Sequence, residues 1–195
     1  MSVVNGYDLE HAEQAIAAGD ADAVSMIRSI YADTRCVRKA ATGREAQIRP
    51  CVRCNTCIGR THSYMLEVRC AVNPVLGRET HLQSATGAAG TRIAYRKRIL
   101  VAGGGPAGME AARIAADLGH EVTLVEQADH LGGKFELAAA LKPELARYLQ
   151  WSVSSTLNDP RITVELETPV TPELVAERQP DALLLAFARG RQARA

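Results

Sequence analysis

Short apolar runs and a helical repeat alternate after residue 97, and together they predict a βαβ unit. Residues 99–102 and 121–125 are apolar runs with the length of buried strands. A glycine turn and a helix from Pro106 to about Leu118 lie between them, and Gly119 is placed to end that helix. Two strands joined through a crossover helix imply a parallel sheet.

The remaining positions of this half continue the alternation of helices and strands. Apolar residues at i, i+3 and i+4 spacing predict a helix face made of Leu145, Tyr148, Leu149, Val153 and Leu157. Alternation at Ile162, Val164 and Leu166 predicts a half-buried strand. A short helix after Pro172 and a buried strand at 182–187 complete the pattern, so we expect an α/β fold.

The first fifty residues predict a helix, a strand and a second helix. Asp8 is placed to cap a helix that Gly19 ends, and residues 23–27 form an apolar run typical of a short buried strand. A further helix is expected over about 33–43. The polar, glycine-containing stretch 77–90 is suited to a linker.

The composition excludes several classes of protein. The chain has 195 residues, of which 47% are hydrophobic, enough for one medium domain or two small ones. With 23 Lys+Arg against 22 Asp+Glu the formal charge is +1, and only 4% of residues are aromatic, so we expect no nucleic-acid partner. No apolar run approaches the length of a membrane span, and the first residues do not resemble a signal peptide. We therefore expect no membrane association and a cytoplasmic location.

Cysteine is the most informative residue type in this chain. Cys51, Cys54, Cys57 and Cys70 follow the pattern C-x2-C-x2-C-x12-C. The total of five cysteines is odd and no secretion signal is present, which argues against a disulfide framework. A tight loop of three thiolates with a distant fourth meets the needs of a [4Fe–4S] cluster, and this is the assignment that the spacing favours.

Two alternatives stay open for the cysteine segment. Zinc also takes four thiolates, or three thiolates and an imidazole such as that of His62, although zinc folds more often use two separated C-x2-C pairs. The thiols could also be unligated. Cys36 lies outside the pattern on a predicted helix, and we expect it to be a buried small apolar residue.

The glycine turn matches the pattern G-x-G-x-x-G, with the sequence Gly103-Gly104-Gly105-Pro106-Ala107-Gly108. The first glycine allows the tight turn, Gly105 lets a pyrophosphate approach the backbone, and Gly108 lets the helix pack closely on the sheet. Glu126, at the tip of the next strand, can accept hydrogen bonds from a ribose diol. These features predict a dinucleotide site; the alternative is an ordinary βα turn beside a solvated glutamate.

With both motifs, the chain resembles the iron–sulfur flavoproteins that include bacterial 2,4-dienoyl-CoA reductase and trimethylamine dehydrogenase, relatives of old yellow enzyme. The resemblance extends to about residue 185. The stretches that carry it are residues 12–22, 48–55, 69–74 and 99–108, with Leu131-Gly132-Gly133 after the second strand.

The resemblance implies three parts along the chain. Residues 1–50 would be the last strands and helices of an FMN-binding TIM barrel, residues 51–97 the iron–sulfur segment and a linker, and residues 98–195 an incomplete Rossmann-like domain for FAD and NAD(P)H. In the barrel part, Arg28 matches the family arginine that binds the FMN phosphate, and Gly6 matches a glycine near the same phosphate. A guanidinium group grips phosphate bidentately, in keeping with that role.

The resemblance also implies a function. In the nucleotide domain it adds Pro106, Ala107, Gly133 and Lys134 to the expected contacts, and it leaves FAD or ADP as the bound nucleotide. The chain would be a segment of an NAD(P)H- and flavin-dependent oxidoreductase that retains the electron-transfer part, with no catalytic residue assigned. In the intact family the substrate is a small molecule, an enoyl-CoA or a methylated amine. The alternative from another class is a non-catalytic module that binds a nucleotide and zinc.

The chain departs from the family pattern in three places. Cys54 and Cys57 are separated by two residues where the family commonly has three, and the family's Ala-Thr-Gly after the last strand is here Ala186-Phe187-Ala188. A complete TIM barrel takes about 250 residues, whereas residues 1–97 are all that precede the nucleotide domain. We therefore expect the FMN site to be completed elsewhere, for example by a second chain, and the chain alone to be inactive.

Overall fold

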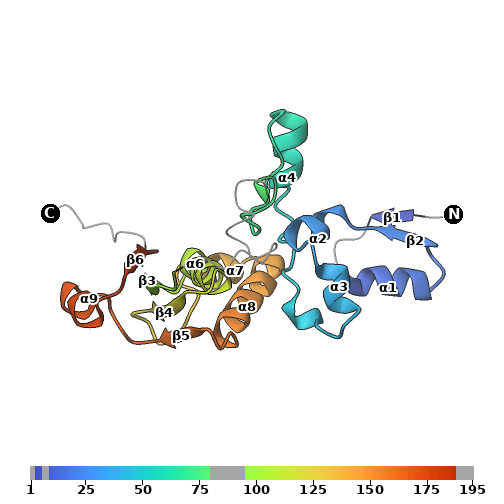
Figure 1. Ribbon diagram of the computed structural model, residues 1–195. Coiled ribbons are helices and arrows are strands. Elements are labelled where there is room, and N and C mark those ends of the chain that lie inside the picture. Colours follow the sequence, from blue (N-terminus) through green and yellow to red (C-terminus); the bar gives the residue numbers. More distant parts are fainter. Residues whose placement is uncertain (1–2, 6–8, 80–94, 188–195) are drawn as a thin grey trace. The chain divides into compact units, whose positions relative to one another are not determined.

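The computed structural model describes residues 3–5, 9–79 and 95–187 of the chain (Figure 1). The chain divides into two compact units: unit 1 comprises residues 1–82 with 142–151, and unit 2 comprises residues 83–141 with 152–195. Both units combine helices with parallel strands, which confirms the mixed α/β class expected from the sequence. Among the helices in the described ranges, none is long and apolar enough to cross a membrane.

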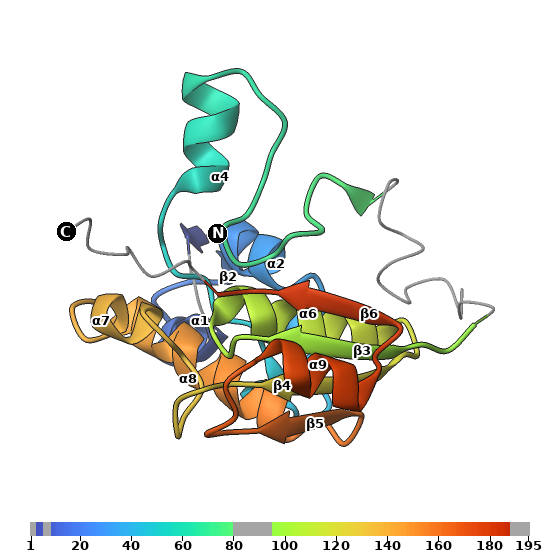
Figure 2. The same ribbon diagram turned by 90° about the vertical axis from the view of Figure 1, so that its left-hand side faces the viewer.

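Unit 2 is built on a four-stranded parallel sheet (Figure 2). Its strands, in chain order, are β3 (Arg98–Ala102), β4 (Glu121–Val125), β5 (Ile162–Glu165) and β6 (Ala182–Leu185). They lie in the spatial order β5-β4-β3-β6, and Ala102 at the end of β3 has Val125 on one side and Leu185 on the other. The predicted βαβ unit is confirmed, while the last strand ends two residues before the expected Phe187.

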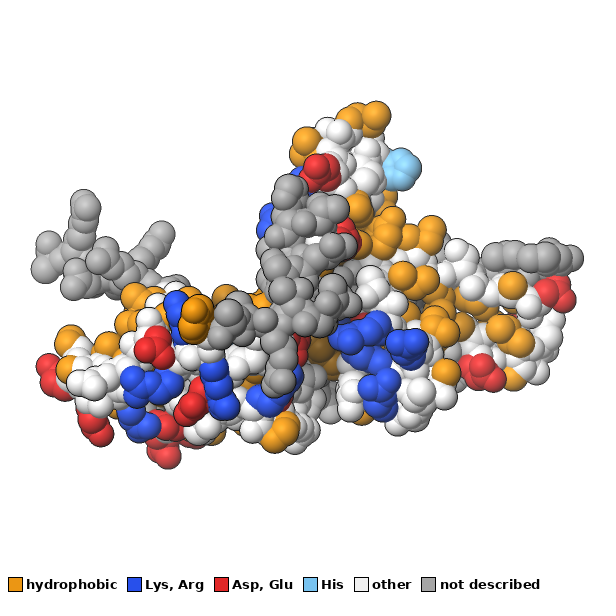
Figure 3. All heavy atoms as spheres, viewed as in Figure 1, with side chains coloured by type: hydrophobic (Ala, Val, Ile, Leu, Met, Phe, Trp, Pro, Cys, Tyr) orange, Lys and Arg blue, Asp and Glu red, His pale blue; other side chains and the backbone are white. Residues whose placement is uncertain are grey.

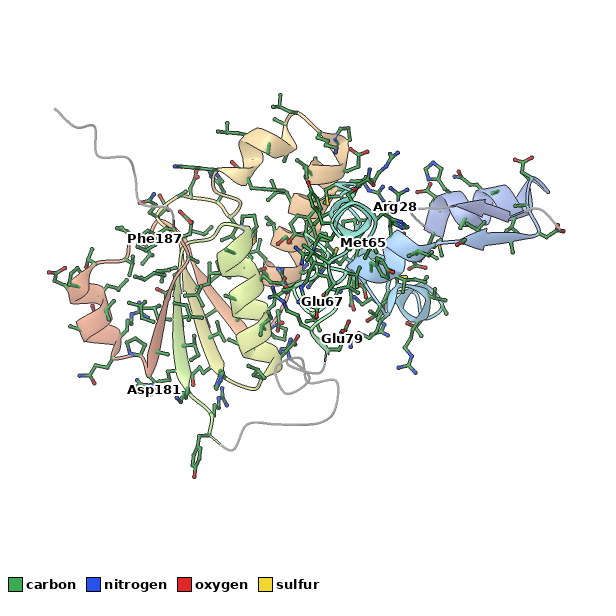
Figure 4. All side chains as sticks on the ribbon, turned by 90° about the horizontal axis from the view of Figure 1, so that it is seen from above. Arg28, Met65, Glu67, Glu79, Asp181 and Phe187 are labelled. Atoms are coloured by element: carbon green, nitrogen blue, oxygen red, sulfur yellow. The ribbon has the colours of Figure 1, made fainter. Side chains whose placement is uncertain are left out.

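Helices α6 (Pro106–Asp117) and α9 (Pro172–Arg178) lie on opposite faces of this sheet (Figure 4). Helix α6 buries Met109 and Ala112 completely. On the other face, Leu174 of α9 packs against a core cluster that contains Leu100 and Val125. The burial of strand residues on both faces explains why β3 and β4 read as continuous apolar runs rather than as alternating ones. Unit 2 also contains the short helix α7 (Phe135–Ala139) and the last residues of α8 (Pro143–Leu157).

Unit 1 begins with two short parallel strands, β1 (Val3–Asn5) and β2 (Ala23–Ser25). Helix α1 (Leu9–Ala17) lies between them in the chain, and Gly19 follows it with a φ of +77°, as expected of a glycine that ends a helix. The elements after β2 are short: α2 (Ile27–Ala32), α3 (Cys36–Ala40), the 3-10 turn η1 (Glu45–Gln47), α4 (Thr56–Ile58) and the π-helical turn η2 (Gly59–Ser63). The first residues of α8 belong to unit 1.

Apolar side chains gather on the surface of the segment that contains α4 and η2 (Figure 3). The exposed fractions are 44% for Ile58, 71% for Tyr64 and 85% for Met65. This part of unit 1 therefore contributes little to the core.

The region after β2 differs from the prediction in a way that matters for function. The sequence predicts a strand over 23–27, but the strand ends at Ser25 because Met26 has φ −132° and ψ 57°, and Ile27 begins helix α2. Ile27 is 56% exposed, so its apolar side chain does not mark a buried strand. Arg28 consequently lies on a helix rather than directly after a strand.

The helix expected over 33–43 is also shorter than predicted. Asp33 accepts a hydrogen bond from the backbone N–H of Arg35, which forms a turn ahead of α3, and the helix ends at Ala40. Three expectations lie outside the described residues: the position of Gly6, most of the linker at 77–90, and the residues after Phe187.

A buried arginine fastens two helical segments within unit 2. Arg113 of α6 is 9% exposed, and its Nη1 donates to the Thr156 hydroxyl at 2.8 Å and to the Ser152 carbonyl at 3.1 Å. Its Nη2 lies 2.5 Å from a carboxylate oxygen of Glu110. Ser152 and Thr156 are both fully buried, so the guanidinium satisfies polar groups that water does not reach.

We predict that Arg113→Met lowers the free energy of unfolding by about 3–5 kcal/mol, because it removes an ion pair with Glu110 and buried hydrogen bonds to Ser152 and Thr156. Urea unfolding followed by circular dichroism measures this change. Arg96→Met is the matched control: Arg96 is 69% exposed in its ion pair with Glu121, and its loss should cost about 0–1 kcal/mol. Equal losses of unfolding free energy in the two variants would show that the buried ion pair stabilises the unit no more than an exposed one.

Candidate functional site

The glycine turn of unit 2 is held tightly on both sides. The Gly103 N–H donates to the Val125 carbonyl at 2.8 Å, and its φ of +112° is a conformation that glycine adopts readily. A Cβ on Gly108 would lie 1.8 Å from the Gly103 carbonyl oxygen, so α6 approaches the turn as closely as a residue without a side chain allows. The predicted roles of Gly103 and Gly108 in turning and close packing agree with this geometry.

Gly105 has the opposite surroundings. A Cβ on Gly105 would have nothing within 4 Å, so the space beside this residue is open. Gly105 directly precedes α6, which begins at Pro106. The N–H groups of Ala107 and Gly108, in the first turn of this helix, lack partners within the helix. An open glycine at a helix N-terminus is the arrangement that binds phosphate groups.

Glu126 and the loop after it close over the other side of the turn. The Glu126 carboxylate accepts hydrogen bonds from the backbone N–H groups of Gly104 at 2.5 Å and of Ala128 at 3.0 Å. Gly132 donates to the Gly104 carbonyl at 2.9 Å, and a Cβ on Gly133 would lie 3.6 Å from the Gly105 Cα. The structure thus brings Gly105, Glu126 and Gly133 together. Lys134 follows this loop with an exposed side chain.

Sequence reasoning missed two features of this loop. A Cβ on Gly104 would lie 2.5 Å from the Leu131 side chain, so the middle glycine of the turn serves loop packing. His130 lies between two carboxylates, with Nδ1 2.5 Å from Asp129 and Nε2 3.1 Å from Glu136. The hydrogen bond to Asp129 and then the charge of Glu136 raise the pKa of His130 above its ordinary value of 6.5. Asp129, His130 and Glu136 follow no regular spacing in the sequence, so no pattern predicted that they would lie together.

In unit 1 the predicted metal ligands come from two segments that helix α2 anchors. Arg28 Nη1 donates to the Asn55 side-chain oxygen at 3.1 Å, between Cys54 and Cys57. The Asn73 side-chain nitrogen donates to the Tyr31 carbonyl at 2.9 Å, three residues after Cys70. Both cysteine segments are therefore fastened to one short helix.

The residue that follows α2 anchors the chain before the first cysteine. The Asp33 carboxylate is 8% exposed and accepts hydrogen bonds from Lys39 Nζ at 2.5 Å and from the backbone N–H of Arg49 at 3.0 Å. Arg49 in turn donates to the Val72 carbonyl, and its guanidinium carbon lies 4.9 Å from the centre of the Trp151 ring. The path from Asp33 through Arg49 thus reaches the segments of both Cys51 and Cys70.

The four cysteines of the pattern interact electrostatically. Burial is the largest influence on Cys51 and raises the pKa of its thiol, and the neighbouring Cys54 and Cys57 raise it further. Burial likewise raises the pKa of Cys70, with added contributions from Cys51 and Cys54. Backbone N–H groups oppose these shifts, as at Cys51, whose sulfur accepts from the Arg53 N–H at 3.4 Å. Cys51 and Cys70 thus have both neighbouring thiols and N–H donors around them, a donor set suited to thiolates.

Within the described ranges, no three His, Cys, Asp or Glu side chains are grouped closely enough to hold a single metal ion. His62, the possible imidazole ligand, is exposed on η2. A cubane differs from a zinc site because each thiolate binds a different iron atom, so the four sulfurs need not converge on one point. Four thiols in the pattern C-x2-C-x2-C-x12-C supply the number and type of ligands that a cluster requires. Cys36 is 1% exposed, in agreement with its expected place in the core.

Comparisons with known proteins agree on a family of flavin enzymes. Residues 98–159 match the family described as FAD dependent oxidoreductase. The chain is 40% identical over 182 residues to an NADH oxidase of Thermoanaerobacter brockii, covering 91% of this chain and 27% of that protein. It is 34% identical over 183 residues to a cinnamate reductase of Clostridium sporogenes, covering 92% of this chain and 26% of that protein.

Solved structures give the same result for the fold. A 2-naphthoyl-CoA reductase complex aligns with a TM-score of 0.82 and 30% identity, over 95% of this chain and 28% of the other. Histamine dehydrogenase from Rhizobium sp. 4-9 aligns with a TM-score of 0.82 and 25% identity, over the same shares of the two chains. The chain spans about a quarter of the length of the relatives that it matches.

We predict that Asp33→Asn destabilises unit 1 by about 2 kcal/mol at pH 7, because it weakens several buried hydrogen bonds to a charged acceptor. Burial raises the pKa of Asp33, but the hydrogen bonds from Lys39 and Arg49 outweigh burial and hold it below the ordinary value of 3.8. The stabilisation by the charged form is therefore present above pH 3.8 and is lost as the pH falls further. The difference between variant and parent should shrink below that pH.

The fluorescence of Trp151, the single tryptophan, reports urea unfolding of this unit at each pH. Asp20→Asn changes an exposed carboxylate of the same unit and serves as the control. A pH-independent loss of stability in Asp33→Asn would contradict the charged role of this residue.

Proposed function

Because the chain belongs, as a partial segment, to the iron–sulfur flavoprotein family of 2,4-dienoyl-CoA reductase and trimethylamine dehydrogenase, we propose that it is the electron-transfer part of a flavin-dependent oxidoreductase. The observation that carries this proposal is the pairing, in one chain, of an open glycine turn with four cysteines in two segments that helix α2 fastens. Each feature suits a redox cofactor, and their combination suits a relay between two cofactors.

In unit 2 the glycine turn would hold FAD or ADP in a Rossmann-like manner. The open side of Gly105 and the N–H groups of Ala107 and Gly108 would face the pyrophosphate. Each oxygen of Glu126 already accepts one backbone hydrogen bond, and each has a second lone pair that a ribose hydroxyl can use. Gly133 lies close enough to the turn to line the same space, with Lys134 next to it.

In unit 1 the thiolates of Cys51, Cys54, Cys57 and Cys70 would hold a [4Fe–4S] cluster. Such a cluster, when bound, accepts and releases single electrons without a proton or a new bond. The chain supplies the thiolates, the N–H groups that stabilise them, and the anchors on α2 that fix the two segments.

The first residues of unit 1 would be the end of an FMN-binding barrel. Two parallel strands, β1 and β2, are an unusual sheet by themselves, because parallel sheets normally have more strands and are covered on both faces. Arg28, at the start of α2, would contribute to the FMN phosphate site together with Gly6, in a site completed by residues outside this chain or by a second chain. The guanidinium has five N–H donors, so the bond to Asn55 leaves others for a phosphate.

The substrate class follows from the relatives and belongs to the whole enzyme. Relatives include a cinnamate reductase and a dimethylamine dehydrogenase, which suggests reduction of an activated double bond or oxidation of a methylated amine, with NAD(P)H as the electron partner. The competing function, a nucleotide- and zinc-binding module without turnover, is less favoured because the described side chains form no group suited to a single ion.

The proposal is tested by anaerobic purification followed by iron, sulfide and flavin analysis with an absorption spectrum. Broad absorption of an iron–sulfur cluster with about four irons per chain supports the proposal. Stoichiometric zinc without a chromophore would favour the competing module instead.

We predict that replacing Cys51, Cys54, Cys57 or Cys70 with serine reduces bound iron, because each thiolate is one of four ligands. Cys36→Ser is the matched control: it changes the same residue type in the core of the same unit and should leave the iron content unchanged. Iron and sulfide assays after reconstitution measure the effect. Iron retained in all four ligand variants would contradict the assignment.

We predict that Gly105→Val weakens binding of FAD and ADP by more than about 100-fold while leaving the fold intact, because its side chain would enter open space on the pyrophosphate path. Glu126→Ala should weaken binding by about 10- to 100-fold through loss of a charge-assisted hydrogen bond. Glu165→Ala removes a carboxylate at the end of the neighbouring strand β5, where it pairs with Arg178, and is the control. Isothermal titration calorimetry measures all three affinities. If Gly105→Val and Glu126→Ala bind FAD and ADP as tightly as the parent, the turn has only a structural role.

A further inference from the structure

Arg28 contacts the loop that carries Cys51, Cys54 and Cys57, called the cysteine loop below. It is also the residue proposed to bind the FMN phosphate. It lies near the start of α2 (Figure 4), and its Nη1 donates to Asn55 across 27 positions of sequence. The family resemblance assigned this residue to the FMN phosphate alone. The helical position of Arg28 allows its side chain to reach the loop between Cys54 and Cys57.

The residue that Arg28 contacts has an unusual backbone conformation. Asn55 has φ 56° and ψ 12°, in the left-handed region, and Arg53 two positions earlier has φ 54°. Asparagine tolerates this region better than most residues, but such conformations persist only where neighbouring contacts hold them. The hydrogen bond from Arg28 fixes the Asn55 side chain and so supports the turn that separates two of the predicted ligands.

The charge of Arg28 also acts on the cysteines. Its positive charge opposes the effect of burial on Cys51. The other arginines of this region have partners of their own: Arg53 forms an ion pair with Glu144 at 2.9 Å, and Arg49 stacks on Trp151. Arg28 therefore supplies a cation beside the loop, and within the described residues 9–79 and 95–187 no carboxylate forms an ion pair with it.

We propose that Arg28 is a positioning residue for the cysteine loop: its hydrogen bond to Asn55 holds the left-handed turn, and its charge raises the reduction potential of the cluster that the loop binds. This inference rests on the proposed [4Fe–4S] site. Reduction adds one electron and one negative charge to a cluster, and no bond forms or breaks. A fixed cation nearby stabilises the reduced form, since cluster potentials depend on net charge, hydrogen bonds and exposure.

Four variants separate the two contributions of Arg28. Arg28→Gln removes the charge together with the guanidinium donor that reaches Asn55, Arg28→Lys keeps the charge, and Asn55→Gly removes only the hydrogen-bond acceptor, at a position where glycine adopts the same φ without strain. Arg38→Gln is the matched control, because it removes an exposed arginine of α3 in the same unit. The potential is measured by spectroscopic redox titration of the reconstituted chain.

We expect the reduction potential to fall in Arg28→Gln and to stay near that of the parent in Arg28→Lys and Arg38→Gln. Hydrogen exchange of the metal-free chain provides the second readout. The Gly59 amide, which donates to the Asn55 carbonyl at 2.9 Å, should exchange about fivefold faster in Arg28→Gln and Asn55→Gly, as expected for the loss of one hydrogen bond worth about 1 kcal/mol. Exchange in Arg38→Gln should match the parent.

The outcomes distinguish failure of this inference from failure of the proposed function. If the parent binds the cluster and Arg28→Gln has the parent's potential and the parent's exchange rates, the inference is wrong and the cluster assignment stands. If Arg28→Gln does not assemble a cluster, faster exchange of the Gly59 amide supports the positioning role and unchanged exchange overturns it. A parent chain that takes up no iron under reconstitution overturns both.

Discussion

The buried carboxylate of Asp33 is the interaction on which the cysteine site most depends. It joins three parts of unit 1, through Lys39 of α3, the Arg35 N–H ahead of that helix, and the Arg49 N–H just before the first cysteine. Burial of a charge is unfavourable unless such partners are present, so these bonds form together or not at all. Helix α2 ends just before Asp33. Its residues Arg28 and Tyr31 form hydrogen bonds with the two cysteine segments. A few polar contacts thus fix a loop that has little core of its own.

The nucleotide turn is held in a different way, by close packing. Gly108 and Gly103 meet at a distance that excludes any side chain, and Gly104 is covered by Leu131. Gly105 is left open among these filled positions. Three of the four glycines are thus fixed by packing and one is accessible, which suits a phosphate ligand because it needs an exposed backbone position in a rigid frame.

Charge is distributed differently in the two candidate sites. In the cysteine loop, burial and neighbouring thiols disfavour thiolates, and N–H groups and the Arg28 charge oppose this effect. At the turn, the Glu126 carboxylate is held by two backbone N–H groups before any ribose is present. In the proposed cluster site the thiols would become charged only on ligation, whereas at the turn the acceptor is already charged and oriented.

The sequence by itself determined the α/β class, the βαβ unit around the glycine turn, the family, and the residues proposed for both sites. It could do so because these features depend on local spacing: apolar runs for β3 and β4, a fixed interval from Gly103 to Gly108, and a repeat of cysteines. Tertiary structure alone decided that residues 23–27 split into a strand and helix α2, since exposure of Ile27 is not visible in its residue type. It also decided the contacts of Arg28 with Asn55 and of Leu131 with Gly104, because these join residues 27 positions apart in both cases. No periodic pattern encodes which distant side chains will meet, so such contacts follow only from the packing of the folded chain.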